Sequence, residues 1–445
     1  MTQAIETQQI KTQGIQPRYG SAFRCIGTEC EDTCCHGMSV LIDKTTYERY
    51  QAFPAEGLGS LVAQYVSINT VNGDASSAAH ATSKVGDSLY GRIRPMSSGD
   101  CPFLSTERLC GVQKEYGAEL LSATCSTYPR ALNRVEDELE VSLYLSCPEA
   151  ARQVLLDAGS IEVVGDASAA GLRVDQVSRM VGGGGPFYKP YGFFWEIREL
   201  VVAMIRDRGR PVWQRLFLLG MLCQRLDEVR GEEQDRVVPG ILKTYGGIVA
   251  SGGLREQLER VEGQPGVQLD VVLRLIDQRV RAGGTGERFL ECFEAFQRGI
   301  GYSPESTAAS DVRRYVEAEE RYCRPFFERH PHILENYLQN YIFRTLFPFG
   351  REESAHSTQQ SIFDEYMLMV MQYVLVYGLL VGVAGEAREE FGEGHVVKVV
   401  QSFAKAVEHS PDFLRGINSF VVRRGLGSPR GIAMLLNFQA MERSA

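Results

Sequence analysis

The sequence carries no excess of positive charge. Its 445 residues include 47 Lys and Arg against 56 Asp and Glu, which gives a formal net charge of -9 at pH 7. A protein that holds nucleic acid through its phosphates needs the opposite balance, so we expect no nucleic-acid partner. An acidic chain suits a soluble protein and a cationic partner.

The amino terminus lacks the features of a secretory signal. Residues 1–17, MTQAIETQQIKTQGIQP, contain neither an apolar run nor a small-residue cleavage pattern. We expect a flexible tail over residues 1–18 and a cytoplasmic protein. In a reducing compartment, a cysteine cluster more often binds metal or takes part in catalysis than forms disulfides.

Cysteine is concentrated in the first third of the chain. Of the 11 cysteines, three are scattered singly at Cys223, Cys292 and Cys323, where we expect small buried side chains. The other eight form two blocks. They are Cys25, Cys30, Cys34 and Cys35, followed by Cys101, Cys110, Cys125 and Cys147. Two short blocks far apart in sequence can bring ligands to one metal centre.

The spacing favours an iron–sulfur cluster over zinc without excluding zinc. No pair of cysteines has the Cys-x2-Cys spacing of zinc fingers and ribbons, whereas iron–sulfur clusters accept irregular spacing. Reduced cysteines that merely pack would explain one or two thiols, but not eight. We expect the ligands to come from the compact motifs, with Cys25 and Cys147 in support. These likeliest ligands are Cys30, Cys34, Cys35, Cys101, Cys110 and Cys125.

The rest of the sequence is predicted to be helical. Apolar residues recur at three- and four-residue intervals over 191–208 and in the helix that follows it. Similar patterns cover residues 232–262, 266–282, 286–299, 308–329, 333–347, 362–384 and 395–408. The run from Tyr366 to Ala384 has no charge and is long enough to span a membrane. Its acidic flanks and its Gln and Tyr residues instead predict a buried core helix, and no membrane insertion.

These patterns predict a mainly α protein in which an amino-terminal, cysteine-rich, metal-binding region packs on a larger all-α helical domain. We expect a flexible tail at 1–18, a cysteine-cluster domain at 19–155, a linker at 156–189 and the helical domain at 190–445.

Four further residues stand out. His36 adjoins the Cys-Cys pair and is either a metal ligand or a solvent-facing side chain. Arg130 could hold a carboxylate through its planar guanidinium, or form a plain salt bridge to a nearby glutamate, Glu136 or Glu138. Asn336 and Asn340 lie one helical turn apart and either line a pocket or hydrogen-bond to other helices.

Several of these motifs resemble the flagellin lysine-N-methylase family. The resemblance lies in FRCIGTECEDTCCHGMSVLID, CPFLSTERLC, LSATCSTYPR and LSCPEAAR, together with ENYLQNYIFRTLFPFG at 335–350. It extends over most of the chain from Phe23. The cysteine pattern alone is also similar to a wider group of zinc- or iron-chelating domains. Met38 departs from the family, which tends to carry Trp there.

The resemblance implies methyl transfer from S-adenosylmethionine to lysines of a protein, flagellin or another, with a cysteine-bound iron–sulfur cluster of the 4Fe-4S type. Arg130 and Tyr128 would then contact the cofactor, and no catalytic residue is assigned. The sequence shows no glycine-rich nucleotide loop after a strand, and its first cysteine block does not match the Cys-x3-Cys-x2-Cys motif of common radical enzymes. The alternative is a non-catalytic metal-binding or electron-transfer protein.

Overall fold

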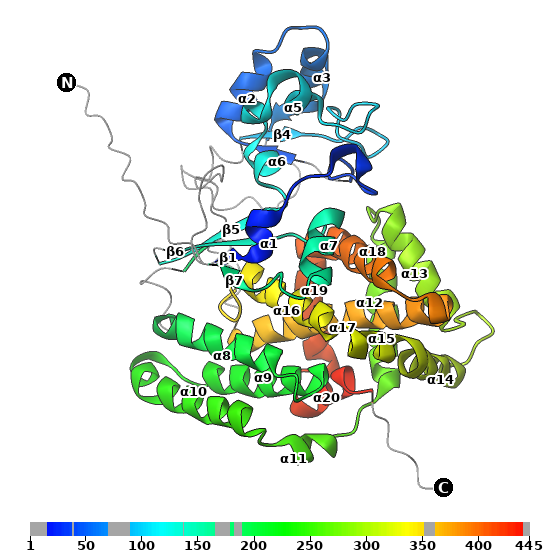
Figure 1. Ribbon diagram of the computed structural model, residues 1–445. Helices are drawn as coiled ribbons and strands as arrows, with labels where there is room; N and C mark the ends of the chain where they lie inside the picture. The colour runs from blue at the N-terminus through cyan, green and yellow to red at the C-terminus, as the bar shows by residue number, and fades with distance from the viewer. Residues whose placement is uncertain are drawn as a thin grey trace.

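The protein is mainly α-helical, as the sequence predicts. The computed structural model describes residues 16–37, 40–69, 90–136, 138–164, 179–181, 189–350 and 361–438. Figure 1 shows a small upper lobe above a larger body of helices. Met38, most of the predicted tail and most of the predicted linker lie outside the described residues.

The upper lobe, residues 40–69 and 90–127, has a hydrophobic core of its own. Tyr50, Leu58 and Phe103 are buried in it, and Cys101 and Cys110 pack against it. Three short antiparallel strands in the order β2-β4-β3 and four helices surround this core. They are β2 (Val40–Ile42), α2 (Lys44–Gln51), α3 (Leu58–Tyr65), β3 (Val66–Ile68), β4 (Gly91–Ile93), α5 (Gly111–Tyr116) and α6 (Ala123–Thr127). Two cysteines of the second block are therefore attached to a packed core.

A second sheet joins this lobe to the helical body. Its order is β6-β5-β8, with β5 antiparallel to β6 and parallel to β8, and a separate pair joins β1 to β7. Buried Val135, Leu143 and Val154 belong to the same core as the large helices. The elements are β1 (Gln16–Pro17), α1 (Arg18–Ala22), β5 (Arg130–Val135), β6 (Glu138–Leu143), α7 (Pro148–Leu156), β7 (Val163–Val164) and β8 (Arg179–Val181).

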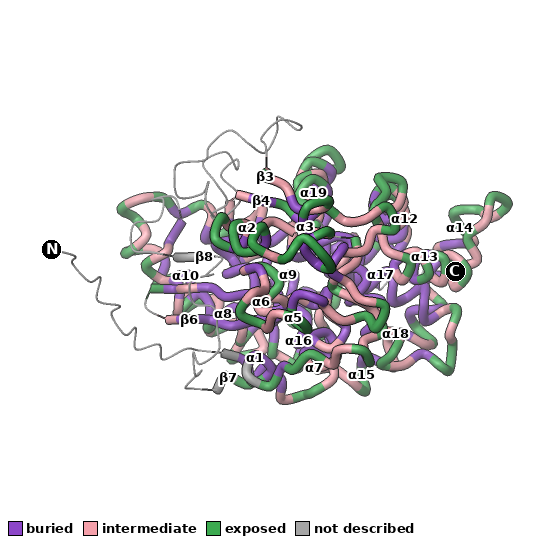
Figure 2. The backbone as a smooth tube through the Cα atoms, turned by 90° about the horizontal axis from the view of Figure 1, so that it is seen from above, coloured by how far each residue is buried: buried purple, intermediate pink, exposed green. Residues whose placement is uncertain are grey.

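The helical body begins at Phe194. It contains α8 (Phe194–Arg206), α9 (Val212–Asp227), α10 (Gln234–Ser251), α11 (Arg255–Glu259), α12 (Pro265–Arg281), α13 (Glu287–Gly299), α14 (Ala308–Ala318), α15 (Arg324–Arg329), α16 (Pro331–Thr345), α17 (Ile362–Ala387), α18 (Glu393–Phe403), α19 (Pro411–Arg424) and α20 (Pro429–Leu436). In Figure 2 its interior is buried and its outer helical faces are exposed.

Helix α17 is the central helix of this body, as the sequence predicts. It is long and apolar enough to cross a membrane, but nearly all of its apolar stretch is buried by other helices. A membrane-spanning helix would present that surface to lipid, so the burial fits a core helix of a soluble protein. A Cβ added to Gly299 on α13 would lie 1.8 Å from the carbonyl oxygen of Gly382 on α17, so glycine allows the two backbones to approach.

Three of the predicted helices contain interruptions. The predicted helix at 232–262 divides into α10 and α11 because Gly252 and Leu254 adopt left-handed backbone conformations, with φ of 69° and 63°. The predicted helices at 308–329 and 395–408 each contain a π-helical turn, η6 (Glu319–Cys323) and η8 (Ala404–Glu408). Such turns widen the helix by one residue and are frequent at functional sites.

Candidate functional site

An ion pair fastens the first cysteine block to the helical body. Nζ of Lys405, on the π-turn η8, lies 2.9 Å from each carboxylate oxygen of Asp32 and donates to the carbonyl oxygen of Thr33 at 3.0 Å. Nε2 of Gln401 donates to the same carboxylate at 2.8 Å. Burial would raise the pKa of Asp32, but the charge of Lys405 and these hydrogen bonds outweigh it and lower the pKa. The loop that carries Cys30 and Cys34 is thus held on α18 and η8.

Each of the eight clustered cysteines interacts with at least one other of the set. The thiol of Cys35 interacts with those of Cys34 and Cys101. Electrostatic interactions connect the rest, namely Cys25 with Cys30, Cys30 with Cys147, Cys147 with Cys34, Cys34 with Cys110, and Cys110 with Cys125. The three scattered cysteines are buried in the helical body.

Crowding raises the pKa values of these thiols. The hydrogen bond to Cys101 contributes most to raising the pKa of Cys35 to about 12, and the bond to Cys35 contributes most to raising that of Cys34. Burial raises the pKa to about 11 for Cys125 and to about 12 for Cys147. Cys34 and Cys125 are nevertheless exposed to solvent as residues, although protein atoms surround most of each thiol group. Thiolates packed this closely repel one another, which a bound cation would relieve.

The donor set suits a thiophilic metal by its chemistry. Thiolates are the preferred ligands of iron–sulfur clusters and of structural zinc. Within the described part of the chain, however, no three His, Cys, Asp or Glu side chains already stand where they could hold one ion together. The thiols are neighbours that would have to turn toward a shared centre. Their role as ligands stays a prediction.

A chain of hydroxyl and imidazole groups runs beside Cys147. The hydroxyl oxygen of Tyr128 lies 3.1 Å from Oγ of Ser146, which lies 2.9 Å from Nε2 of His409. Gln401 donates to the carbonyl oxygen of Ser146 at 3.0 Å. Burial, followed by the neighbouring Cys147, raises the pKa of Tyr128, so the phenol stays protonated. The peptide bond between Tyr128 and Pro129 is cis.

Three side chains, at the end of α18, on η8 and directly after η8, therefore contact the cysteine region, and no local sequence pattern marks them. Lys405, Gln401 and His409 bind residues that lie more than 250 positions earlier in the chain. A local pattern contains no information on such partners. The interruption of a helix by a π-turn has no simple sequence signature either.

Within the described residues Arg130 forms no salt bridge, and its contact with a cofactor carboxylate stays a prediction. Its Nη2 donates to the carbonyl oxygen of Phe23 at 3.2 Å, and its guanidinium carbon lies 5.2 Å from the centre of the Phe23 ring. Its Nε is buried without a hydrogen-bond partner. Burial and the charge of Arg24 lower its pKa. The expected salt bridge to Glu136 or Glu138 is not formed. The buried Nε of Arg130 therefore has no acceptor among the described residues.

His36 pairs with a carboxylate. Its Nδ1 lies 2.8 Å from Oδ1 of Asp100, and both side chains are partly exposed. This contact joins the first cysteine block to the residue before Cys101.

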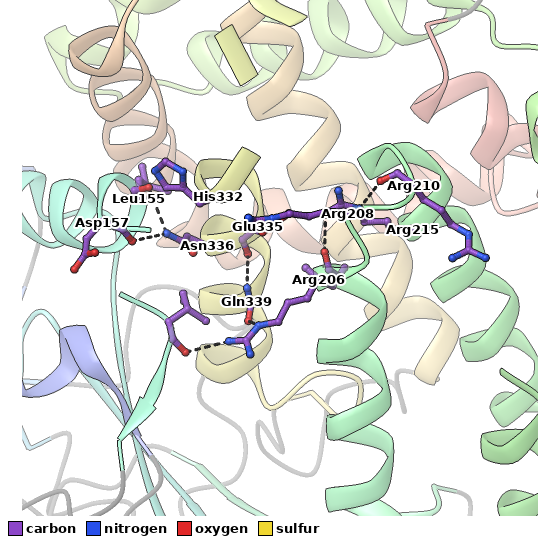
Figure 3. Close-up of polar contacts among 12 residues, drawn as sticks. Leu155, Asp157, Arg206, Arg208, Arg210, Arg215, His332, Glu335, Asn336 and Gln339 are labelled. Carbon is purple, nitrogen blue, oxygen red and sulfur yellow. Dashed lines mark hydrogen bonds and ion pairs between the residues drawn. The ribbon is translucent and has the colours of Figure 1, made fainter. Parts of the chain in front are cut away.

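Helix α16 carries the polar stripe predicted around Asn336 and Asn340, and it hydrogen-bonds to other elements (Figure 3). Nδ2 of Asn336 donates to the carbonyl oxygen of Asp157 at 3.0 Å, and Nδ2 of Asn340 donates to that of Leu143 at 2.9 Å. On the same helix, buried Glu335 forms ion pairs with Arg208 at 2.9 Å and Arg215 at 2.8 Å. Of the two roles predicted for Asn336 and Asn340, the structure therefore shows hydrogen bonding to other elements.

Two surface grooves lie away from the cysteines. One, of about 470 Å³, lies between α8 and α10, and the other, of about 370 Å³, lies between α17 and α19. Neither is lined by any of the eight clustered cysteines or by Arg130.

The helical body is the part of the chain that identifies the family. Residues 198–435 match the model of the FliB lysine N-methylase C-terminal domain. The chain therefore belongs to the FliB lysine N-methylase family, which confirms the resemblance seen in the sequence.

Two curated relatives illustrate this membership. The chain is 36% identical over 143 residues to a lysine-N-methylase of Salmonella typhimurium, which is 32% of each chain. It is 36% identical over 143 residues to the flagellar biosynthetic protein FliU of Salmonella muenchen, covering 32% of this chain and 76% of that one. The alignment spans about a third of the length of the lysine-N-methylases. No solved structure matches the chain.

Proposed function

We propose that the protein is a cytoplasmic protein-lysine N-methylase that uses S-adenosylmethionine and a cysteine-bound iron–sulfur cluster. One observation carries the proposal: Asp32 and Lys405 fasten the first cysteine block to the domain that matches the methylase family. Thiolate donors suit an iron–sulfur cluster, with zinc as the alternative occupant.

The cysteines and Arg130 would have different roles in this function. The two cysteine blocks would hold the metal centre, with Cys25 and Cys147 in support of the other six. S-adenosylmethionine, when bound, would supply the methyl group that the lysine nitrogen receives. The guanidinium of Arg130, beside Tyr128, would bind the cofactor's carboxylate, since its Nε has no hydrogen-bond partner among the described residues.

The substrate would be a protein lysine, in flagellin or in another protein. The relatives support this, since they include a flagellar biosynthetic protein and lysine-N-methylases. The acidic chain would attract a cationic side chain.

The alternative is a non-catalytic metal-binding or electron-transfer protein. One observation favours it: neither of these two grooves is lined by the eight cysteines. A metal centre closed by protein ligands would serve structure or electron transfer alone.

Cofactor binding separates the two functions. We expect the wild-type protein, purified without oxygen, to bind S-adenosylmethionine in calorimetry and to transfer a labelled methyl group to flagellin. Arg130→Gln should weaken cofactor binding by about tenfold, because a charge-assisted hydrogen bond contributes about 1.5–3 kcal/mol. Arg152→Gln, which removes another half-exposed arginine near the first block, is the matched control. A metal-loaded protein that binds no S-adenosylmethionine would support the alternative.

A further inference from the structure

The groove between α8 and α10 is lined by a set of apolar side chains, here called its floor, and by two carboxylates, here called its rim. The apolar side chains come from both helices and from the residue before α8. They are Phe193, Leu200, Ala203, Pro239 and Leu242. Two carboxylates, Glu196 and Glu199, line the same groove from α8. Its volume of about 470 Å³ matches a few side chains of a partner.

The two carboxylates have no cationic partner among the described residues. Both are exposed. Glu196 lies in the first turn of α8, where the helix dipole favours a carboxylate. Glu199 lies one turn further on, so its charge adds only repulsion on the same helical face.

Helix α10 adds a backbone acceptor near this groove. Pro239 lies inside the helix and has no N–H, so the carbonyl oxygen of Asp235 loses its usual donor. A helix interior containing proline is costly, and here the proline ring lies in the groove floor.

We propose that this groove docks a cationic amphipathic segment of the protein substrate, with apolar side chains on the floor and lysine or arginine at Glu196 and Glu199. The inference rests on the proposed function for the class of partner, a lysine-bearing protein. The negative charge of the rim favours a cationic protein segment, because it repels nucleic acid and anionic membranes. Helices α8 and α10 lie in the lower part of the body, away from the upper lobe (Figure 1), and no clustered cysteine lines their groove, so the groove would hold the partner remotely from the methylated lysine.

A peptide-binding measurement tests the inference independently of methylation. The probe is a fluorescent amphipathic helical peptide of leucine and lysine, and its counterpart carries glutamate in place of lysine. We expect the full chain to bind the lysine peptide, with affinity falling as salt rises, and not to bind the glutamate peptide. Glu196→Gln/Glu199→Gln should weaken binding about tenfold through the loss of two rim ion pairs.

Two further variants make the result decisive. Ala203→Arg places a long cationic side chain in the groove at an exposed helical position and should abolish binding. The matched control is Glu256→Gln/Glu259→Gln, which removes two exposed carboxylates with the same spacing on α11, where they line neither groove. Binding that survives both groove variants, or that falls equally in the control, would overturn the inference.

Kinetics would then connect the groove to methylation. With a protein substrate, the Glu196→Gln/Glu199→Gln variant should have a KM about tenfold higher than the wild type and an unchanged kcat. The reason is that the groove would bind the substrate equally well in the ground state and in the transition state. If no protein is methylated but peptide binding still depends on the groove, the docking site stands and the proposed function fails.

Discussion

The ammonium of Lys405 lies 2.9 Å from both carboxylate oxygens of Asp32, and the two residues are 373 positions apart in the chain. Both side chains are largely buried, with 15% and 17% of their surfaces exposed. The contact connects the first cysteine block to the π-turn η8, and through it to the methylase-family domain.

Removing one member of this pair should loosen the cysteine block. We expect Lys405→Met to lower the free energy of unfolding by about 1–3 kcal/mol, because it leaves the Asp32 carboxylate without its counter-charge. The matched control is Lys398→Met on α18, whose partner Glu291 is half exposed, and it should change stability by less than about 1 kcal/mol. Chemical denaturation measures both changes. Equal effects of the two substitutions would contradict the buried role of Lys405.

The cysteine assignment makes a prediction about metal content. Serine in place of Cys34, Cys35 or Cys101 should remove bound metal, since a hydroxyl is a poor ligand for a thiophilic ion. Cys223→Ala should retain the metal, because Cys223 is buried in the helical body away from the thiol group. Iron, sulfide and zinc assays on anaerobically purified protein measure the difference. Metal retained by all three serine variants would disprove the assignment.

The crossing of α13 and α17 should tolerate no side chain at Gly299. Its added Cβ would collide with the carbonyl oxygen of Gly382, so Gly299→Ala should destabilise the protein by about 1–3 kcal/mol through overpacking. Gly416→Ala on α19 is the matched control, since a Cβ there meets no other atom. That control should be stabilising by about 0.5–1 kcal/mol. Thermal unfolding of the two variants should shift in opposite directions, and a shift in the same direction would argue against the close crossing.

Glu319 on η6 should make stability depend on pH. Burial raises its pKa, and the hydrogen bonds from Arg324 and Tyr377 only partly offset this. A carboxyl group whose folded pKa is raised binds its proton more tightly in the folded state, so stability falls as pH rises from the unfolded to the folded pKa. Glu319→Gln should remove the part of this pH-dependent loss of stability that comes from Glu319. Unfolding measured across this pH window checks it, and an unchanged profile would contradict the shift.

The helices could be predicted because their signals are local. The apolar period marked α13, α16 and α17 to within a few residues, whereas the assignment of the eight clustered thiols as metal ligands stays a prediction. The contacts of Lys405 and His409 could not be predicted, since their partners lie hundreds of residues away. The short strands of the upper lobe were missed because three-residue segments carry too little alternation to be recognised.

The central claim is that the cysteine centre carries lysine methylation. Its most direct test measures metal content and methyl transfer to flagellin in the same anaerobic preparations of the wild type and of the Cys34→Ser, Cys35→Ser and Cys101→Ser variants. The account predicts that metal and methylation are lost together in each variant, while Cys223→Ala keeps both. A variant that holds no metal yet methylates its protein substrate at the wild-type rate would contradict it.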